Sequence, residues 1–333
     1  MPKSAVRRQA AGERLRIVPT VNAIILVNLL DLKGLDVMNA VKTFFLMMVL
    51  TSLLLLVGAA LGGLEGIFIA FIFAIIMNFG AYWFSDRIAL GMAHAHPVTE
   101  QEDPELYRIV SEQAQAAGVP MPKVYEIESD SPNAFATGRS PNKATVAVTT
   151  GIRRLLNREE LGGVLAHEMA HVGNRDTLIM AIVATLAGAI SMLAFLAQIS
   201  MFFGGMGGGD RDRGSGGIIG LLIVALVMPL AASIVRAAIS RTREFQADAT
   251  GAKTSGNSYA LANALEKLEM GVRHRPMKVA EGASHLFIVN PLSGRSMASL
   301  FSTHPSTAER ARRLCECHPA TDFIESGRRT FRT

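Results

Sequence analysis

Four long apolar segments contain no charged residue, and they constrain the fold more than any other feature of this chain. A membrane-spanning helix needs about 17 to 25 predominantly apolar residues, and each segment reaches that length. Hydrophobic residues make up 50% of the 333 residues, which agrees with a membrane protein. We therefore predict four transmembrane helices, at residues 43–62, 67–84, 177–203 and 218–235.

The four predicted spans form two hairpins that divide the chain. Gly62 to Gly66 makes a tight turn in the first hairpin, and Gly204 to Gly217 makes a glycine-rich loop in the second. The remaining segments are polar. We predict an N-terminal extension at residues 1–37, a first membrane hairpin at 38–84 and a second at 177–235. The polar domain is then made of two halves, at residues 85–176 and 236–333.

Basic residues predict the side of the membrane on which the polar domain lies, because they concentrate at the cytoplasmic ends of spans. They precede the first and third spans and follow the fourth, which puts all of them on one side: Lys33, Lys42, Arg153, Arg154, Arg158, Arg175, Arg236, Arg241 and Arg243. We expect a multi-pass protein of the cytoplasmic (inner) cell membrane, with both termini and the polar domain in the cytoplasm. The net charge of +5 then indicates a lipid bilayer as partner and no nucleic acid.

The N-terminal extension has an interpretation of its own. Four arginines precede a short apolar run, Val21 to Leu30, that is too short to span a bilayer. No clear signal-peptide cleavage site follows it. We interpret Met38 as the natural start and residues 1–37 as an upstream extension that is not translated, which N-terminal sequencing of the native protein would test.

The first half of the polar domain is predicted to contain both helices and strands. Apolar residues recur at helical spacing from Pro104 to Ala117, and Gly151 to Leu156 starts a short helix. Three segments follow strand patterns, at residues 124–127, 133–138 and 144–149. Asn157 followed by Glu160 is a capping-box variant, which predicts a helix over residues 158–174.

That last helix carries the sequence His167-Glu168-Met169-Ala170-His171. Two histidines four residues apart lie on one helical face, so both imidazoles can bind one metal ion. Glu168 between them can act as the general base toward a water molecule. This pattern is typical of zinc metalloproteases, in which two histidines and a further ligand hold Zn²⁺ and a water.

A catalytic zinc ion needs a third ligand, and the predicted topology indicates where it lies. The fourth span returns the chain to the side of the metal helix just before Glu244 and Asp248, which are four apart on one helical face. Glu244 is a candidate ligand, and Asp248 could hold a ligating histidine. A charged helix with ion pairs at i,i+4 spacing explains the same residues equally well, so spacing alone leaves both interpretations open.

The sequence resembles the HtpX family of membrane zinc metalloproteases, bacterial relatives of the CAAX prenyl endopeptidases. The resemblance runs from about Met38 to about Arg313. It rests on separated motifs in the same order: PNAFATG (132–138), HEMAHVGNRD (167–176), SRTREFQAD (240–248) and STHPS (302–306). The implied fold class is a mainly α membrane protein with four transmembrane helices and a cytoplasmic α+β gluzincin-like metalloprotease domain.

The resemblance also implies roles for individual residues. One Zn²⁺ per chain would be bound by His167, His171 and Glu244, with Glu168 as general base and Asp248 supporting the metal helix. The resemblance further assigns His304 and Arg310 to oxyanion stabilisation, and the substrate groove to a strand containing Asn133, Ala134, Phe135 and Ala136. Taken alone, His304 would be read as an ordinary surface histidine beside Pro305. The strand could also bind an extended peptide by main-chain pairing, which tolerates many sequences.

These features predict a membrane-anchored, zinc-dependent endopeptidase. The resemblance implies a role in quality control, with misfolded, damaged or misassembled membrane proteins as substrates at the cytoplasmic face. One alternative is a protease that processes prenylated peptides, and another is a non-catalytic zinc-binding membrane chaperone in which Glu168 has no role.

The chain has only two cysteines, Cys315 and Cys317, which excludes a disulfide framework. We interpret both as ordinary thiols. Nothing in the sequence indicates the oligomeric state.

Overall fold

The computed structural model describes residues 18–185, 241–277, 279, 281–291 and 305–316. The chain divides into two units, residues 1–42 and 43–333, and each is described by itself. In the first unit the described backbone is helical from Val18 onward, as the first part of helix α1 (Val18–Trp83). Most of the second predicted hairpin, residues 186–235, lies outside the described residues.

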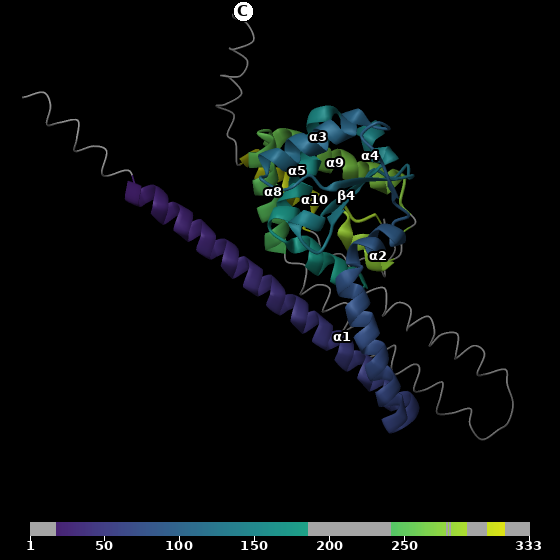
Figure 1. The fold of residues 1–333 in the computed structure, drawn as a ribbon. Helices are drawn as coiled ribbons and strands as arrows, with labels where there is room; N and C mark the ends of the chain where they lie inside the picture. The colour runs from purple at the N-terminus through teal and green to yellow at the C-terminus, as the bar shows by residue number, and fades with distance from the viewer. Residues whose placement is uncertain (1–17, 186–240, 278, 280, 292–304, 317–333) are drawn as a thin grey trace, which may run out of the picture. The chain divides into compact units, whose positions relative to one another are not determined.

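In the second unit, the rest of α1 folds back on itself (Figure 1). The side-chain amide of Asn78 donates a hydrogen bond to the hydroxyl of Thr51 at 2.7 Å, whereas a straight helix would separate these residues by about 40 Å. The two arms touch where a Cβ on Gly58 would lie 2.4 Å from the carbonyl oxygen of Gly66. Gly63, between them, has a φ of +57°, which glycine adopts without steric cost. The reversal therefore lies in the glycine-rich turn.

Residues Gly63–Trp83 form a helix long and apolar enough to cross a membrane, with a mean hydropathy of 2.1. Its large side chains, such as Phe68, Ile69 and Phe79, are exposed, which is typical of a surface that meets lipid. Two further described helical segments, Val41–Leu56 and Asp176–Thr185, are apolar but shorter. The presence of four spans stays a prediction.

The polar domain is built on a mixed sheet with the strand order β1–β2–β4–β3. The inner strands β2 (Lys123–Ile127) and β4 (Thr145–Thr149) are parallel. The outer strands β1 (His96–Pro97) and β3 (Ala134–Thr137) pair antiparallel to them. The strands predicted near residues 124–127, 133–138 and 144–149 are thus confirmed, and β3 lies at an edge of the sheet.

Both faces of the sheet are covered, so all five residues of β4 are buried. One face packs, through Val124, Val146 and Val148, against the helices α3 (Pro104–Ala116), α5 (Arg158–Gly173) and α9 (Ser258–His274). The other face packs against α2 (Ser85–Met92) and residues 286–287. The remaining described elements are η1 (Pro141–Lys143), α4 (Thr150–Leu155), α8 (Arg241–Ser255), η2 (Glu281–Leu286) and α10 (Thr307–Glu316).

Helix α5 begins where the sequence predicts. Asn157 accepts from the backbone N–H of Glu160 at 2.9 Å, and the Glu160 carboxylate accepts from the backbone N–H of Asn157 at 3.1 Å. This reciprocal cap satisfies two N–H groups that would otherwise lack helical partners. The helix then runs between the sheet and α8, and α10 packs on α8 and α9. These contacts bring residues from α5, α8 and α10 to one place.

Candidate metal centre

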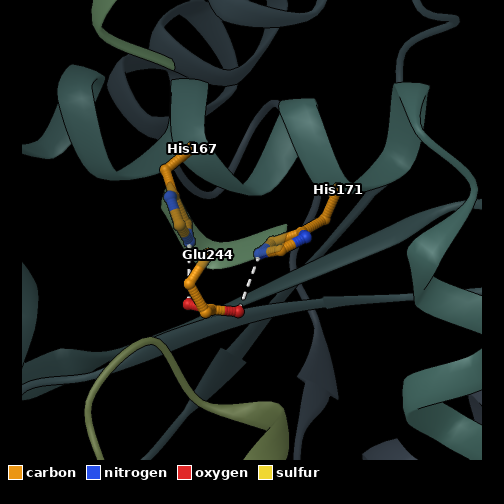
Figure 2. A group of neighbouring side chains, drawn as sticks. All are labelled: His167, His171 and Glu244. Atoms are coloured by element: carbon orange, nitrogen blue, oxygen red, sulfur yellow. Dashed lines mark ion pairs between the residues drawn. The ribbon is translucent and has the colours of Figure 1, made fainter. Parts of the chain in front are cut away.

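Three potential metal ligands converge from two helices (Figure 2). His167 and His171 lie one turn apart on α5, and Glu244 lies in the first turn of α8. One ligand atom from each lies within 4.8 Å of the others. The carboxylate of Glu244 bridges the pair, at 3.9 Å from His167 Nε2 and 3.5 Å from His171 Nε2. The fold therefore places Glu244 beside the two histidines, as the predicted topology indicated.

All three side chains are buried, with exposed fractions of 1%, 3% and 2% for His167, His171 and Glu244. Imidazole and carboxylate groups removed from water need polar partners or a bound ion. Glu168, between the two histidines on the same helix, is equally buried.

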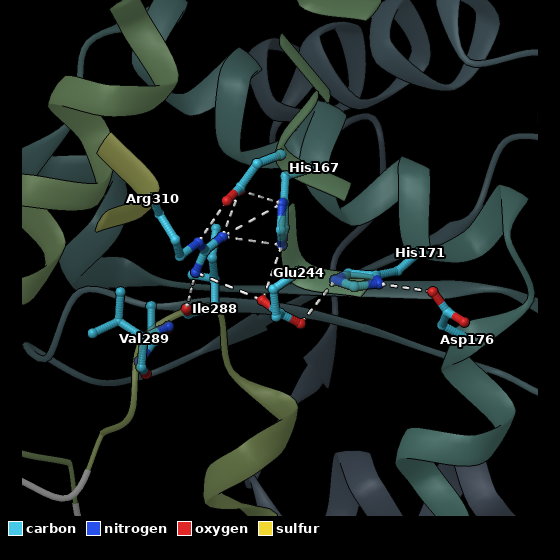
Figure 3. Close-up of polar contacts among 9 residues, drawn as sticks. His167, His171, Asp176, Glu244, Ile288, Val289 and Arg310 are labelled. Carbon is cyan, nitrogen blue, oxygen red and sulfur yellow. Dashed lines mark hydrogen bonds and ion pairs between the residues drawn. The ribbon is translucent and has the colours of Figure 1, made fainter. Parts of the chain in front are cut away.

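Each histidine is also held from behind by a carboxylate (Figure 3). His167 Nδ1 lies 2.9 Å from Asp248 Oδ1, and His171 Nδ1 lies 3.4 Å from Asp176 Oδ2. A carboxylate at Nδ1 leaves the lone pair of Nε2 for a metal ion. Two imidazole nitrogens and one carboxylate oxygen match the protein ligands of catalytic zinc. The residues present therefore fit Zn²⁺.

The role of Asp176 escaped the sequence analysis, although the residue stands only five positions after His171. Helix α5 ends at Gly173 and is capped by Asn174, and Arg175 then adopts a φ of +57°. A non-glycine residue in this left-handed region is uncommon and has no clear sequence signal. This turn brings Asp176 back to His171, and Arg243 of α8 lies 3.3 Å from the Asp176 carboxylate.

Arg310 reaches the metal centre, with its guanidinium 3.4 Å from His167 Nε2 and 3.7 Å from Glu244 Oε2, and its expected role in oxyanion stabilisation stays a prediction. Its guanidinium binds the Asp248 carboxylate in two places, Nε to Oδ2 at 2.8 Å and NH2 to Oδ1 at 2.7 Å. NH1 donates to the carbonyl oxygen of Ile288 at 3.0 Å, and the side chain is 1% exposed. The structure thus makes Arg310 a support for Asp248, and through it for His167, because most of its donors already have partners.

The electrostatic surroundings of the two histidines differ. Burial lowers the pKa of His167, and the hydrogen bond with Asp248 offsets this only in part because Arg310 is also near. Burial acts on His171 in the same direction, but Asp176 and Glu244 outweigh it and raise the pKa of His171 to about 10. His167 is therefore already neutral before a metal ion binds, whereas His171 holds a proton that a metal ion must displace.

Glu168 has the surroundings that a general base needs. Burial raises the pKa of its carboxyl to about 7, and the neighbouring Glu244 acts in the same direction, while His171 opposes it. The backbone N–H of Ala136 donates a hydrogen bond to the carboxylate. A carboxylate with a pKa near neutrality both accepts and returns a proton efficiently.

The residues predicted to line the substrate groove are all buried. Ala134, Phe135 and Ala136 form most of β3, and the Asn133 side-chain amide, just before the strand, donates to the carbonyl oxygen of Val289 at 2.7 Å. The strand thus runs past Glu168, but residues 288–289 contact its outer edge. His304 lies outside the described residues.

Comparison with known proteins gives concordant results. The model of Peptidase family M48 matches residues 100–318. A protein described as "Protease HtpX homolog" from Syntrophobacter fumaroxidans is 52% identical over 82% of this chain and 97% of its own length. Another, from Persephonella marina, is 53% identical over 84% of this chain and 97% of its own.

Among solved structures, the crystal structure of "S. mikatae Ste24p" is similar, with a TM-score of 0.45 and 21% identity, over 84% of this chain and 66% of that one. At that level of similarity it supports no inference about the site or the substrate.

Proposed function

This chain belongs to peptidase family M48, and from that premise we propose that it cleaves misfolded or damaged membrane proteins at the cytoplasmic face of the membrane. The chain is a membrane-associated metalloprotease. One observation carries the proposed chemistry: two histidines and a glutamate converge around a position next to Glu168, a buried carboxylate with a pKa near 7.

His167, His171 and Glu244 would hold one Zn²⁺ ion, which supplies Lewis acidity toward water and a peptide carbonyl when it is bound. Glu168 removes a proton from the attacking water and later returns it to the leaving amine. Asp248 and Asp176 keep the two imidazoles in the tautomer and orientation that ligation needs. We assign oxyanion stabilisation to His304, since Arg310 is engaged with Asp248.

The position of the metal helix supports action close to a membrane. The apolar helix Asp176–Thr185 starts five residues after His171 and is the beginning of the third predicted span. Four spans and a cytoplasmic polar domain are the arrangement that best fits the basic residues at the span ends. Segments of misassembled membrane proteins that emerge at the cytoplasmic surface would then be within reach of the site.

The deciding experiment is zinc-dependent cleavage of casein, an unfolded protein, by the full chain in detergent. Wild type, Glu168→Gln and the control Glu159→Gln are purified without metal and then given Zn²⁺. Glu159 is an exposed residue in the first turn of the same helix. We expect wild type and Glu159→Gln to cleave, and Glu168→Gln to bind zinc but cleave about 10²- to 10⁴-fold more slowly.

The outcome separates the alternatives. Cleavage of casein contradicts a protease restricted to prenylated peptides. Zinc binding by all three proteins, with cleavage by none of them, contradicts the proposed activity and leaves the prenylated-peptide protease and the zinc-binding chaperone as the alternatives.

A further inference from the structure

The outer edge of β3 passes the general base and presents the backbone carbonyl groups of Ala134 and Ala136, while the Ala134 N–H donates to Asn133 Oδ1 at 3.1 Å. The backbone carbonyl of Asn133 accepts from the N–H of Thr149, so this residue faces β4. Residues along an antiparallel strand alternate, and the N–H and C=O groups of Ala134 and Ala136 therefore face away from the sheet. Since the Ala136 N–H reaches Glu168, an extended chain paired with this edge would lie beside the metal centre.

A segment of the chain itself already occupies part of that edge. The backbone N–H of Ile288 donates to the carbonyl oxygen of Ala134 at 3.1 Å. The amide of Asn133 binds the next residue on both sides, donating to the Val289 carbonyl oxygen at 2.7 Å and accepting from its N–H at 3.4 Å. The bond between Ile288 and Ala134 joins two main chains, as in an added peptide strand, and the Asn133 side chain holds the main chain of Val289 beside it.

We name residues Ser284–Asn290 the strap, because Ile288 and Val289 lie on the outer edge of β3. Arg310 holds the strap at the Ile288 carbonyl oxygen, as Figure 3 shows. Phe287 packs edge-to-face on Phe135, with ring centroids 5.1 Å apart. His285, which has no metal spacing in the sequence, is buried with Nε2 3.2 Å from the Met180 carbonyl oxygen.

The strap lies within a loop whose two ends are close together. The backbone N–H of Met277, three residues after α9, donates to the carbonyl oxygen of Pro291 at 3.1 Å. The strap is therefore part of a loop with a closed base, which can leave β3 without unfolding α9. Leu286, Phe287 and Ile288 are at most 2% exposed, so departure of the strap uncovers the apolar surface on which they pack.

On the basis of the peptidase function above, we propose that the strap is an autoinhibitory occupant of the substrate site. Ile288 and Val289 take the place of a substrate main chain on the β3 edge, and they must leave before a peptide can bind. The strap also indicates the substrate class: an extended segment with large apolar side chains, bound through its main chain and packed on Phe135. Such a segment is what a misfolded membrane protein exposes.

When the strap can occupy the site, the apparent affinity for substrate equals the intrinsic affinity multiplied by the fraction of molecules in which the β3 edge is open. Weakening the strap should therefore raise kcat/KM through KM and leave kcat little changed. Ile288→Pro removes the N–H that donates to Ala134, and the matched control Ile288→Ala loses the side chain but keeps that N–H. We expect kcat/KM for oxidised insulin B chain to be about 3- to 10-fold higher for Ile288→Pro than for Ile288→Ala.

A second variant covers the case in which Ile288→Pro does not fold. Phe287→Ala removes the contact with Phe135 and keeps the backbone, and it should also lower KM. If both folded variants cleave more slowly than wild type with a raised KM, the strap is a fixed wall of the groove, and the proposal is overturned.

Hydrogen exchange tests the displacement without catalysis. Zinc-loaded, full-length Glu168→Gln is mixed with oxidised insulin B chain, and exchange at the Ile288 and Val289 amides is followed by mass spectrometry. We expect both amides to exchange at least about tenfold faster when the peptide is bound. Peptide binding that leaves them protected refutes the strap proposal even where wild type cleaves. If the amides exchange faster but the wild type does not cleave any substrate, displacement of the strap is supported and the peptidase function is refuted.

Discussion

Gly251 of α8 lies directly on the backbone of His167. A Cβ added to Gly251 would be 2.8 Å from the His167 nitrogen and 2.9 Å from its Cα. Real Cβ atoms do not approach backbone so closely, so α8 reaches this position only because residue 251 has no side chain. The close approach sets how far Glu244 and Asp248, on the same helix, extend toward the histidines of α5.

Gly251→Ala should therefore separate the two helices and weaken the metal centre. We expect a loss of about 1–3 kcal/mol in the free energy of unfolding, as for other overpacked sites, together with weaker zinc binding. The matched control is Gly162→Ala on α5, where the nearest atom outside the helix is Gln113 Nε2 at 3.5 Å. The control should be neutral or stabilising by up to about 1 kcal/mol. Equal effects in thermal unfolding in detergent would contradict the close-packing argument.

The two carboxylates behind the histidines should contribute similarly to zinc affinity but differently to stability. Asp176→Asn and Asp248→Asn should each weaken zinc binding about 10- to 100-fold, measured by competition with a chelating dye. Asp248→Asn also leaves the buried Arg310 without its closest carboxylate and with only the longer ion pair to Glu244, at 3.7 Å, and the loss of such a buried partner costs about 3–5 kcal/mol. Asp176 is paired with Arg243 at the less buried end of the site, where the side chain of Arg243 is 15% exposed. A stability loss as large for Asp176→Asn as for Asp248→Asn would show that this distinction is wrong.

Zinc uptake should release a proton from His171. Its pKa is about 10 in the metal-free protein, so the ring is protonated at pH 8, and ligation requires the neutral form. Zinc affinity should accordingly rise with pH between about pH 7 and 10. Calorimetric titration in two buffers of different ionisation enthalpy measures the protons released, for which we expect about one per ion from this residue. Asp176→Asn removes a cause of the raised pKa, so it should release fewer protons than wild type.

Arg310 can be tested against the oxyanion role suggested by resemblance. If it supports Asp248, Arg310→Lys should lower both zinc affinity and thermal stability, because lysine cannot make the two parallel bonds to the carboxylate. An oxyanion stabiliser would behave differently, with a lower kcat at unchanged stability and zinc affinity. Measuring kcat, zinc affinity and the unfolding temperature on the same preparation distinguishes the two roles.

Much of the local structure was predictable because its causes are local. The capping box at Asn157 and Glu160 marks the start of α5, and the period-two pattern of residues 144–149 marks β4. The glycine-rich turn before Gly66 likewise marks the reversal in α1. Each signal depends on residues a few positions apart, so it can be recognised in the sequence without knowledge of the tertiary structure.

The sequence alone also determined the chemistry of the site. The pair His167 and His171 needs only helical spacing to share one face, and Glu168 follows from the same motif. Glu244 and Asp248 were candidates from topology and spacing, with a plain charged helix as an equal alternative. The fold removed that ambiguity by setting α8 against α5 at Gly251.

Only the tertiary structure decided which groups surround these ligands. Asp176 reaches His171 through an unusual backbone turn at Arg175, and the buried Arg310 binds the Asp248 carboxylate. The strap lies on β3, with Val289 hydrogen-bonded to Asn133. Asn133 and Val289 are far apart in sequence, and no periodicity or cap links them. Their contact depends on how separate elements pack and on which buried polar groups need partners, and those requirements exist only once the chain has folded.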